Sequence, residues 1–246
     1  MARTADEIKD AVKEHYGERA KQASSCCGPA PASSRDRLYV VDDVADLPDT
    51  VASYGCGNPT AIAGLSEGEV VLDLGSGPGL DCFLSAKQVG ATGHVIGLDM
   101  TQEMLDLANA NREKLGVTNV EFRKGEMEAM PVDDATVNAI ISNCVINLSP
   151  DKDAVFRESF RVLKPGGRFH VSDIVTWREP SEAEKDELAL WAGCASGALL
   201  EADYIARLQA AGFGEVRVDS RSPIGDKPWY SATVSAFKPA ASLGCC

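Results

Sequence analysis

The side chains with the clearest chemical potential in this sequence are cysteines. Cys144 lies at the carboxyl end of a predicted strand, within Ser-Asn-Cys-Val-Ile-Asn-Leu, and Cys194 follows fifty residues later. Upstream, Cys56 is flanked by glycines, and Cys26 and Cys27 are adjacent to each other. Thiolate sulfur is the preferred ligand of soft acceptor atoms. The cysteines therefore predict a site that holds a soft, thiol-binding atom.

A glycine-rich loop at 73–79, Asp-Leu-Gly-Ser-Gly-Pro-Gly, follows a short apolar run. Its glycines allow a tight turn and a close approach of the backbone to a ligand. Leu80 stands where a dinucleotide fingerprint needs a third small residue, and no Gly-Lys-Ser/Thr follows to make a P-loop. Asp99 ends the next predicted strand, where an acid can accept hydrogen bonds from ribose hydroxyls, and Glu128 is placed to reach an adenine. The pattern resembles motif I of S-adenosylmethionine (SAM) methyltransferases.

The remaining cysteines and the histidines favour simpler interpretations. Cys82 lies among apolar neighbours in the helix predicted after the glycine loop, so we interpret it as a buried core residue. The sequence has no Cys-x-x-Cys pair, and its three histidines stand at no ligand spacing, which argues against structural zinc. No histidine lies in a motif that would activate a cysteine nucleophile. Cys245 and Cys246 end a tail of small residues that we interpret as disordered.

The elements that must position these residues alternate between strand and helix. A capping box at Thr4 and Glu7 predicts a helix over 6–22, and the Ser/Pro/Gly-rich stretch at 24–35 predicts a mobile loop that carries Cys26 and Cys27. Apolar runs and helical periodicity then predict strands at 70–74, 94–98, 120–123, 137–142 and 168–175 and helices at 80–89, 101–116 and 151–163. Such alternation is typical of a mostly parallel α/β sheet that binds ligands beyond the carboxyl ends of its strands.

The C-terminal part of the sequence has a different pattern. Helices are predicted at 182–191 and 202–211, and alternating strands at 215–218 and 230–237 can pair antiparallel across a turn near 222–228. We expect these strands to complete the sheet with an antiparallel edge.

The formal net charge of −13 over 246 residues argues against nucleic acid as a partner, because such an interface needs a basic surface. A neutral or cationic small substrate fits this charge. The first 25 residues are charged rather than apolar, and no stretch reaches the roughly 20 apolar residues of a membrane helix. We therefore expect a cytoplasmic protein with no membrane partner, whose thiols stay reduced. We also expect a monomer, although none of these features determines the oligomeric state.

Taken together, five segments resemble the arsenite methyltransferase family: 54–57, 73–82, 97–104, 142–148 and 193–199. The likeness extends from about residue 5 to about residue 237. It implies that Cys144, Cys194 and Cys56 bind trivalent arsenic, and that Cys27, or Cys26 beside it, forms a redox disulfide with Cys56. It also implies a Rossmann-like class I SAM methyltransferase sheet, a C-terminal α/β arsenic-binding part and an external thiol reductant of the glutathione or thioredoxin type.

By the same likeness, seven residues match positions that line the SAM site in this family: Tyr54, Gly75, Asp81, Asp99, Met100, Met127 and Asn143. The loop residues Asp73, Ser76 and Gly77 and the acid Glu128 complete the predicted cofactor set. One departure is Leu80, where family members commonly carry arginine, and this difference bears on how the carboxylate end of the cofactor is held.

The resemblance implies methylation of thiolate-bound As(III) by SAM, with disulfide-coupled reduction between methylation steps, as a route to arsenic detoxification. Two alternatives stay open: a SAM-dependent C- or O-methyltransferase of a small metabolite, and a non-enzymatic arsenite-binding protein. The expected organisation is an N-terminal helix and cysteine-bearing loop at 1–64, a SAM-binding core at 65–176 and an arsenic-binding C-terminal region at 177–246.

Overall fold

The computed structural model describes residues 4–23, 35–60, 63–179, 181, 197–224 and 228–240. Several sequence predictions concern residues outside these ranges: the helix at 182–191, the terminal cysteine pair, Cys26, Cys27 and Cys194. In the described part of the chain, no helix has both the length and the apolar character needed to cross a bilayer.

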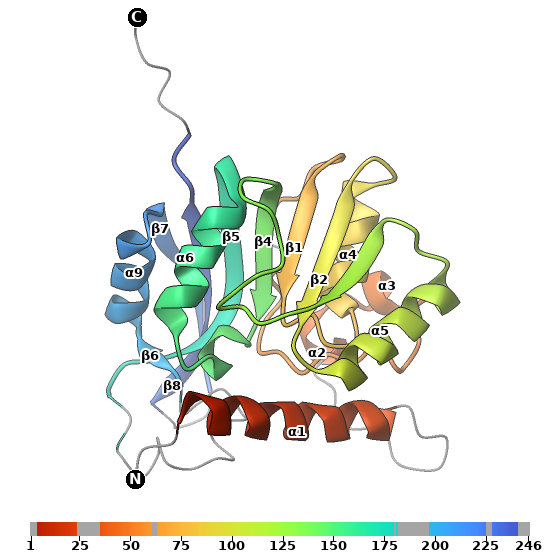
Figure 1. Cartoon of the computed structure of the whole chain (residues 1–246), viewed down its shortest axis with the longest axis horizontal. Coiled ribbons are helices and arrows are strands. Elements are labelled where there is room, and N and C mark those ends of the chain that lie inside the picture. The colour runs from red at the N-terminus through yellow and green to blue at the C-terminus, as the bar shows by residue number, and fades with distance from the viewer. Residues whose placement is uncertain are drawn as a thin grey trace, which may run out of the picture.

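Within the described residues, eight strands form one sheet in the order β3-β2-β1-β4-β5-β8-β7, with the short strand β6 also paired to β5 (Figure 1). The strands are β1 Val70–Leu74, β2 His94–Asp99, β3 Val120–Lys124, β4 Val137–Asn143, β5 Leu163–Thr176, β6 Leu199–Leu200, β7 Gly214–Pro223 and β8 Trp229–Phe237. Neighbours from β3 to β5 run parallel, whereas β8 is antiparallel to both β5 and β7. The mostly parallel sheet with an antiparallel edge is confirmed, with β8 lying between β5 and the outermost strand β7.

The helices cover both faces of this sheet. They are α1 Ala5–Ala23, α2 Arg35–Leu38, α3 Val41–Val44, α4 Leu80–Val89, α5 Gln102–Leu115, the 3₁₀ helix η1 Ile146–Leu148, α6 Lys152–Val162 and α9 Glu201–Ala210. One apolar cluster packs α6 and α9 against the sheet, and a second packs α4 and the segment around α2 and α3 against the other face. Burial on both faces explains why β1 and β4 read as continuous apolar runs rather than as alternating ones.

The predicted elements match the described structure closely, except at the end of β7 and near the start of β5. The strand predicted at 215–218 is β7 Gly214–Pro223 and extends into the turn predicted near 222–228. We predicted that Lys164-Pro165-Gly166-Gly167 closes the preceding helix and that the strand begins at Arg168. Instead β5 begins at Leu163, directly after α6, and its register with β4 shifts between the Val137–Leu163 and Ala139–Arg168 pairs. The shift is a bulge, and Gly166, at φ +80°, supplies the left-handed backbone that it requires. Short elements such as α2, α3, η1 and β6 were not predicted, because four residues or fewer carry no periodicity.

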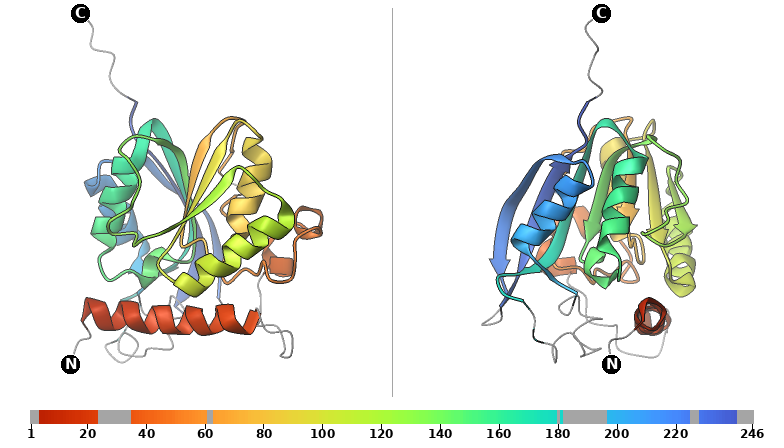
Figure 2. Two further views of the ribbon diagram at one scale, coloured as in Figure 1. Left: turned by 45° about the vertical axis from the view of Figure 1, so that its right-hand side comes forward. Right: turned by 60° about the vertical axis from the view of Figure 1, so that its left-hand side comes forward.

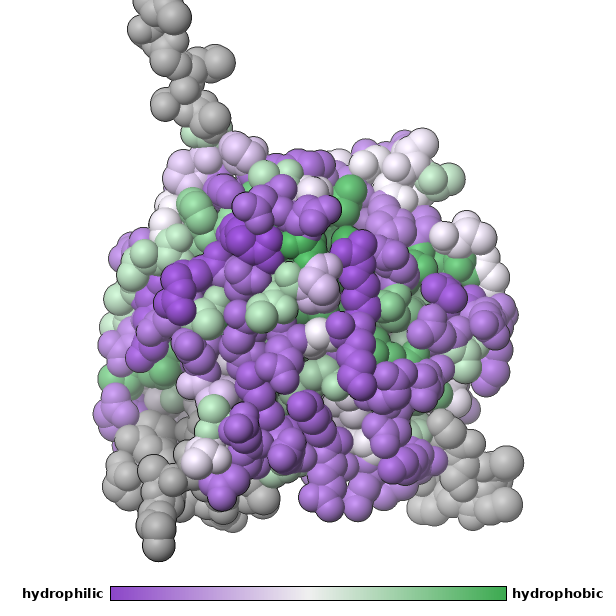
Figure 3. Space-filling model, viewed as in Figure 1, coloured by the Kyte–Doolittle hydropathy of each residue, from purple (hydrophilic) through white to green (hydrophobic). Residues whose placement is uncertain are grey.

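Helix α1 lies across the end of the sheet toward which the parallel strands β1 to β5 point (Figures 1 and 2). Its predicted capping box is present: the Thr4 amide donates to Glu7 Oε2 at 2.8 Å, and the Glu7 amide donates to Thr4 Oγ1 at 3.3 Å. Ile8, Val12 and Ala20 are buried beneath the helix. Hydrophilic side chains cover the band of the surface that α1 occupies in Figure 3, so the helix buries its apolar stripe inward.

Candidate functional site

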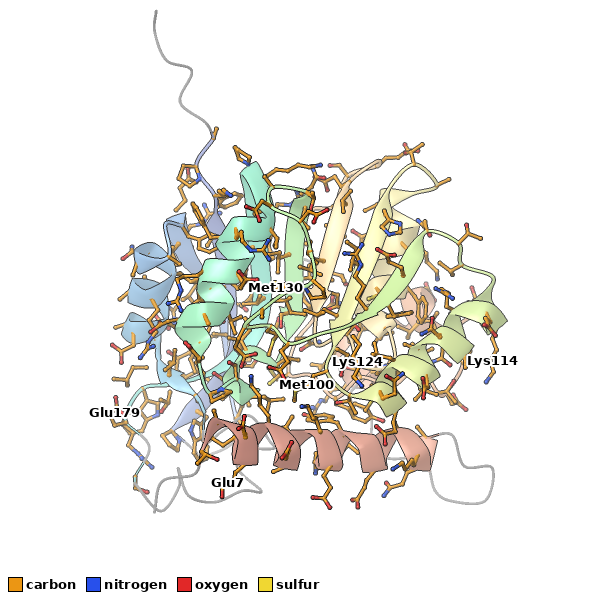
Figure 4. All side chains as sticks on the ribbon, viewed as in Figure 1. Glu7, Met100, Lys114, Lys124, Met130 and Glu179 are labelled. Carbon is orange, nitrogen blue, oxygen red and sulfur yellow. The ribbon has the colours of Figure 1, made fainter. Side chains whose placement is uncertain are left out.

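A pocket lies between the carboxyl ends of β1, β2 and β4 and helix α1. All eleven residues of the predicted cofactor set line this one pocket: Tyr54, Asp73, Gly75, Ser76, Gly77, Asp81, Asp99, Met100, Met127, Glu128 and Asn143. Met100, labelled in Figure 4, lies between the sheet and α1. Cys144 lines the same pocket. The structure therefore brings the cofactor candidates and one arsenic-ligand candidate into a single cavity.

The glycine-rich loop folds back onto the end of β2. The amides of Gly75 and Ser76 both donate to the carbonyl of Leu98, at 2.7 and 3.0 Å. Gly75 has φ +66°, and a Cβ on it would lie 2.3 Å from a methyl group of Val145. No larger residue fits this turn without moving Val145. A Cβ on Gly77 would meet nothing within 4 Å, so the backbone there is open to a ligand.

Asp99, at the end of β2, contacts the glycine-rich loop through its carboxylate. Its Oδ2 accepts a hydrogen bond from the Gly77 amide at 2.9 Å, and its Oδ1 accepts one from the Thr101 amide at 2.8 Å. Burial raises the pKa of this carboxyl group, while the amides of Thr101 and Gly77 favour its charged form. Each carboxylate oxygen keeps lone pairs that a ligand hydroxyl can use. The predicted acid therefore stands at the pocket wall with acceptor capacity left.

Two further acids, Asp73 and Asp81, are buried in the pocket wall. Burial, and next the nearby Asp81 carboxylate, raises the pKa of Asp73 well above its ordinary value. Burial also raises the pKa of Asp81 to about 6, against hydrogen bonds from Tyr39 and Asn143 that favour the charged form. In the described part of the chain, no Lys, Arg or His forms an ion pair with Asp73, Asp81 or Asp99. This concentration of buried acid suits a cationic ligand.

Two hydroxyl groups in the pocket wall have no partner. Tyr54 Oη and Ser76 Oγ are buried, and neither makes a hydrogen bond within the described structure. A buried polar group without a partner costs about 1–3 kcal/mol, so such groups are commonly satisfied by a ligand or water. Both groups lie among the residues predicted to bind the cofactor, and their state fits a polar ligand in this pocket.

Helix α1 closes the pocket from outside through Lys9, Val12 and Tyr16. Lys9 Nζ pairs with Glu126 Oε2 at 2.7 Å and with Glu128 Oε1 at 3.4 Å. Glu128 also accepts a hydrogen bond from the Ser149 hydroxyl at 2.6 Å. The carboxylate that we predicted on the adenine side is thus engaged with α1 and with the segment after η1, while still lining the pocket.

Cys144 immediately follows β4 and has an uncommon backbone conformation. Its φ of +63° lies in the left-handed region, which a residue with a side chain seldom adopts away from functional sites. Its amide donates to the Ser172 carbonyl at 2.7 Å. The side chain is 6% exposed and packs in one cluster with residues such as Val12, Ala198 and Trp229. The fold therefore holds this residue in the pocket lining, in one cluster with Val12 of α1.

Cys56 lies at the border of the same cluster as Cys144, half-buried, in a segment without regular secondary structure. Cys82 lies elsewhere: it is buried in α4, and its thiol donates to Asp73 Oδ2 at 3.2 Å. Burial, followed by the charge of Asp73, raises the pKa of the Cys82 thiol well above its ordinary value. The prediction that Cys82 is a core residue is confirmed.

The described residues nearest in sequence to Cys194 are Gly197 and Ala198. Ala198 packs in the cluster that contains Cys144. A Cβ on Gly197 would lie 2.0 Å from the Asn147 carbonyl oxygen, so the backbones of Gly197 and η1 are in direct contact. Gly197, three residues after Cys194 in the sequence, therefore lies beside the residues that follow Cys144.

A cluster of buried polar side chains joins η1 to β5 and α6 by hydrogen bonds. Asn147 Nδ2 donates to Asp173 Oδ1 at 2.8 Å, and Lys152 Nζ donates to the carbonyls of Asn147 and Ser149 at 3.2 and 2.9 Å. Burial raises the pKa of Asp173 to about 7, although the Lys152 charge acts in the opposite direction. Sequence analysis identified Asn147 only as part of the segment 142–148. It did not identify Asp173 and Lys152 beside Asn147, Lys9 at the pocket or Tyr39 behind Asp81, because these four residues belong to no recognisable motif.

Comparisons with known proteins agree on one class of enzyme. Residues 65–215 match a family described as a methyltransferase domain. The chain is 43% identical to the arsenite methyltransferase of Halobacterium salinarum, over 97% of this chain and 68% of that protein. It is 38% identical to that of Aquipseudomonas alcaligenes, over 94% of this chain and 72% of that protein. The crystal structure of an arsenic(III) S-adenosylmethionine methyltransferase from Chlamydomonas reinhardtii superposes with a TM-score of 0.73 at 38% identity, covering 80% of this chain and 73% of that one.

Proposed function

Because this chain belongs to the arsenite methyltransferase family, a family of SAM-dependent enzymes that methylate arsenic, we propose that Cys144, Cys56 and Cys194 hold As(III) beside the predicted cofactor site. The observation that carries the proposal is that Cys144 and all eleven cofactor candidates line one cavity. A soft metalloid held by thiolates there lies beside the predicted cofactor site, as methyl transfer requires.

The pocket suits SAM, which is cationic at its sulfonium and carries ribose, adenine and amino-acid groups. Asp81 and Asp99 supply buried negative charge, and Tyr54 and Ser76 supply hydroxyl groups that have no hydrogen-bond partner among the described residues. We propose that Asp99 binds the ribose hydroxyls and that the glycine loop accommodates the amino-acid end. When bound, SAM supplies an electrophilic methyl group.

Support for a shared thiolate site comes from the cluster that contains Cys144. Cys56 borders this cluster, and Ala198 belongs to it. Gly197 follows Cys194 by three residues, and three residues of chain span at most about 11 Å. This length of chain is compatible with Cys194 as the third thiolate of the proposed site. We propose that residues 177–246 contribute to arsenic binding in this way, on a SAM-binding core at 65–176.

Arsenite at neutral pH is mostly uncharged As(OH)₃, so an acidic protein does not repel it. Exchange of its hydroxides for three thiolates leaves a pyramidal arsenic with an outward lone pair, and this lone pair is the nucleophile. No general base is required. The residues act by alignment, placing arsenic in line with the methyl carbon, and orientation of this kind supplies roughly 7–11 kcal/mol of barrier reduction in favourable systems.

Methyl transfer formally leaves arsenic pentavalent, and pentavalent arsenic binds thiolates poorly. Two electrons must return to it. We propose that Cys56 and Cys27, or Cys26 beside it, supply these electrons by closing a disulfide as arsenic becomes trivalent again. An external thiol of the glutathione or thioredoxin type then reopens the bond by exchange. Because these steps need reduced thiols, we place the enzyme in the cytoplasm and assign it to arsenic detoxification.

The proposal is tested by incubating the pure protein with SAM and arsenite, then separating the arsenic species by chromatography with mass detection. We expect methylated arsenic only when SAM is present. In a single turnover without added thiol, we expect the protein to lose two free thiols, and the Cys56→Ser variant to lose none. Bound arsenite without product would instead indicate a binding protein. Failure to bind arsenite would favour a carbon or oxygen substrate.

The raised pKa of Asp81 predicts pH-dependent cofactor binding. Its folded-state pKa of about 6 lies above the ordinary value of about 3.9, so the carboxyl group loses its charge as the pH falls through 6. We expect the Kd for SAM to rise about tenfold between pH 7 and pH 5, since one pKa unit corresponds to a factor of ten. Between about pH 4 and 6 the folded protein without SAM keeps a proton on Asp81 that the unfolded chain has lost. The free energy of unfolding therefore declines as the pH rises from about 4 to 6.

Isothermal titration calorimetry at pH 5, 6, 7 and 8 measures this effect. Asp81→Asn should weaken SAM binding at pH 7 and reduce the slope of log Kd against pH, because the amide cannot titrate. A smaller slope of log Kd against pH should remain in this variant, because burial also raises the pKa values of Asp73 and Asp99. An Asp81→Asn variant with the wild-type slope would assign the titration to another group.

A further inference from the structure

The backbone of Cys56 is held on both sides by side chains from other parts of the chain. Its amide donates to Asn143 Oδ1 at 3.0 Å, and its carbonyl accepts a hydrogen bond from Ser231 Oγ at 3.0 Å. These partners are 87 and 175 residues away in sequence. Because the segment around Cys56 lacks regular secondary structure, side-chain contacts of this kind take the place of a helix or strand in fixing it.

Asn143 is the last residue of β4 and directly precedes Cys144. Its Oδ1 also accepts from the Gly57 amide at 3.2 Å, and its Nδ2 donates to the Gly57 carbonyl at 2.7 Å. A Cβ on Gly55 would lie 2.0 Å from Asn143 Oδ1, so this close approach depends on glycine. One amide side chain therefore clamps the segment that carries Cys56 to the strand that carries Cys144.

The strands β5 and β8 support the same segment from the other side. A Cβ on Gly57 would lie 2.4 Å from Ser172 Oγ, so Gly57 packs directly on β5. Ser231 stands on β8 opposite Ile174 of β5. The segment thus rests across three neighbouring strands. Ser231 does not line the cofactor pocket, which separates its contact with Cys56 from any contact with SAM.

Asn143 also reaches the wall of the cofactor pocket. Its Nδ2 donates to Tyr39 Oη at 2.8 Å and approaches Asp81 Oδ2 at 3.4 Å, while Tyr39 Oη donates to Asp81 at 2.8 Å. The position of the Cys56 segment is therefore tied to a pocket residue on α4 as well as to Cys144. A substitution at Asn143 would disturb both sites, whereas a substitution at Ser231 disturbs the Cys56 segment alone.

We propose that Asn143 and Ser231 are positioning residues that fix Cys56 by its main chain, and so set where its thiol stands relative to Cys144 for binding As(III). This inference rests on the proposed function. Arsenic takes three sulfur ligands in a pyramid, so two thiols presented from a rigid frame need no reordering on binding. Loss of the Ser231 contact frees the Cys56 carbonyl and weakens the contribution of its thiol.

The experiment compares Ser231→Ala with wild type, with Ser231→Thr and with Ser235→Ala. Ser231→Thr keeps the hydroxyl group. Ser235 is the matched control, because it is a buried serine four residues along the same strand whose hydroxyl group makes no hydrogen bond in the described structure. X-ray absorption of the protein loaded with one equivalent of arsenite counts the sulfur ligands, steady-state methylation gives the KM for arsenite, and calorimetry gives the Kd for SAM.

We expect three sulfur ligands in wild type, Ser231→Thr and Ser235→Ala. In Ser231→Ala we expect a sulfur count between two and three and a KM for arsenite about fivefold higher, the effect of losing one hydrogen bond. The Kd for SAM should stay within twofold. A merely structural role would lower the melting temperature of Ser231→Ala without changing the sulfur count.

Ser231→Ala with the sulfur count and arsenite KM of Ser235→Ala would overturn the positioning inference and leave the proposed function standing. Wild type with no arsenic–sulfur bonds, or Cys56→Ser with all three sulfur ligands retained, would overturn the thiolate assignment and this inference together. If Ser231→Ala unfolds, a Ser231→Thr variant that shows the lowered sulfur count despite its hydroxyl group would also overturn the inference.

Discussion

Replacing Cys144 with serine should lower kcat/KM for arsenite methylation by at least about 100-fold, which corresponds to about 2.7 kcal/mol of lost transition-state stabilisation. Serine is close to cysteine in size, but its oxygen is a hard ligand that does not hold trivalent arsenic as thiolate does. Because a serine of nearly the same size leaves the shape of the pocket lining unchanged, we expect the Kd for SAM to stay within about twofold. Cys194→Ser should have the same effect on turnover. Arsenic speciation and calorimetry measure the two quantities.

Cys82→Ser is the matched control for this change. Cys82 is also buried, and serine can keep its hydrogen bond to Asp73. It borders no part of the cluster that contains Cys144. We expect Cys82→Ser to methylate arsenite at a rate within about threefold of wild type, since its contact is conserved. A Cys144→Ser variant that methylates arsenite at the wild-type rate would contradict the shared thiolate site. That result would favour a carbon or oxygen atom of a small metabolite as the methyl acceptor.

Asp99→Asn should weaken SAM binding by about 100-fold or more, because hydrogen bonds to charged groups contribute about 1.5–3 kcal/mol each and 1.4 kcal/mol is a factor of ten. One Asp99 oxygen accepts from Gly77 and the other from Thr101. An asparagine can satisfy only one of these amides, and its NH₂ group faces the other. The variant therefore loses both an acceptor for the ribose and part of the support of the glycine loop. Calorimetry with SAM measures the change.

The control for Asp99→Asn is Asp106→Asn on α5. Asp106 is exposed, does not line the cofactor pocket and accepts a hydrogen bond from the side chain of Gln102, so the same chemical change there should leave the Kd for SAM within twofold. Thermal unfolding of Asp99→Asn separates loop damage from global unfolding. A Kd for SAM equal to that of wild type would show that Asp99 supports the loop without contacting the cofactor.

Much of the candidate site could be predicted because parallel strands gather their carboxyl ends at one edge. Asp73 and the glycine loop follow β1, Asp99 ends β2, and Cys144 follows β4. Each of these residues was placed by a local signal, namely an apolar run that ends in a polar or glycine-rich segment. Once the strands pair, this common position brings them together without any further information.

The bulge in β5 and the position of β8 could not be predicted from local sequence patterns. The residues Lys164-Pro165-Gly166-Gly167 predict a turn by their composition, yet they form a bulge because β4 pairs with β5 on both sides of them. The pairing of β8 with β5 places Ser231 next to the Cys56 segment. Neither feature is visible in the periodicity of the strands concerned, because register depends on the partner strand.

The sequence by itself determined the α/β order of elements, the glycine loop, the acids that face the pocket and the cysteines capable of binding a soft metalloid. It did so because hydrophobic periodicity, turn residues and side-chain chemistry are local properties. Only the tertiary structure decided how Cys56 is held, through Asn143 and Ser231, and how α1 closes the pocket through Lys9. These contacts join residues that are far apart in the chain, and strand register and helix docking alone bring them within hydrogen-bond distance.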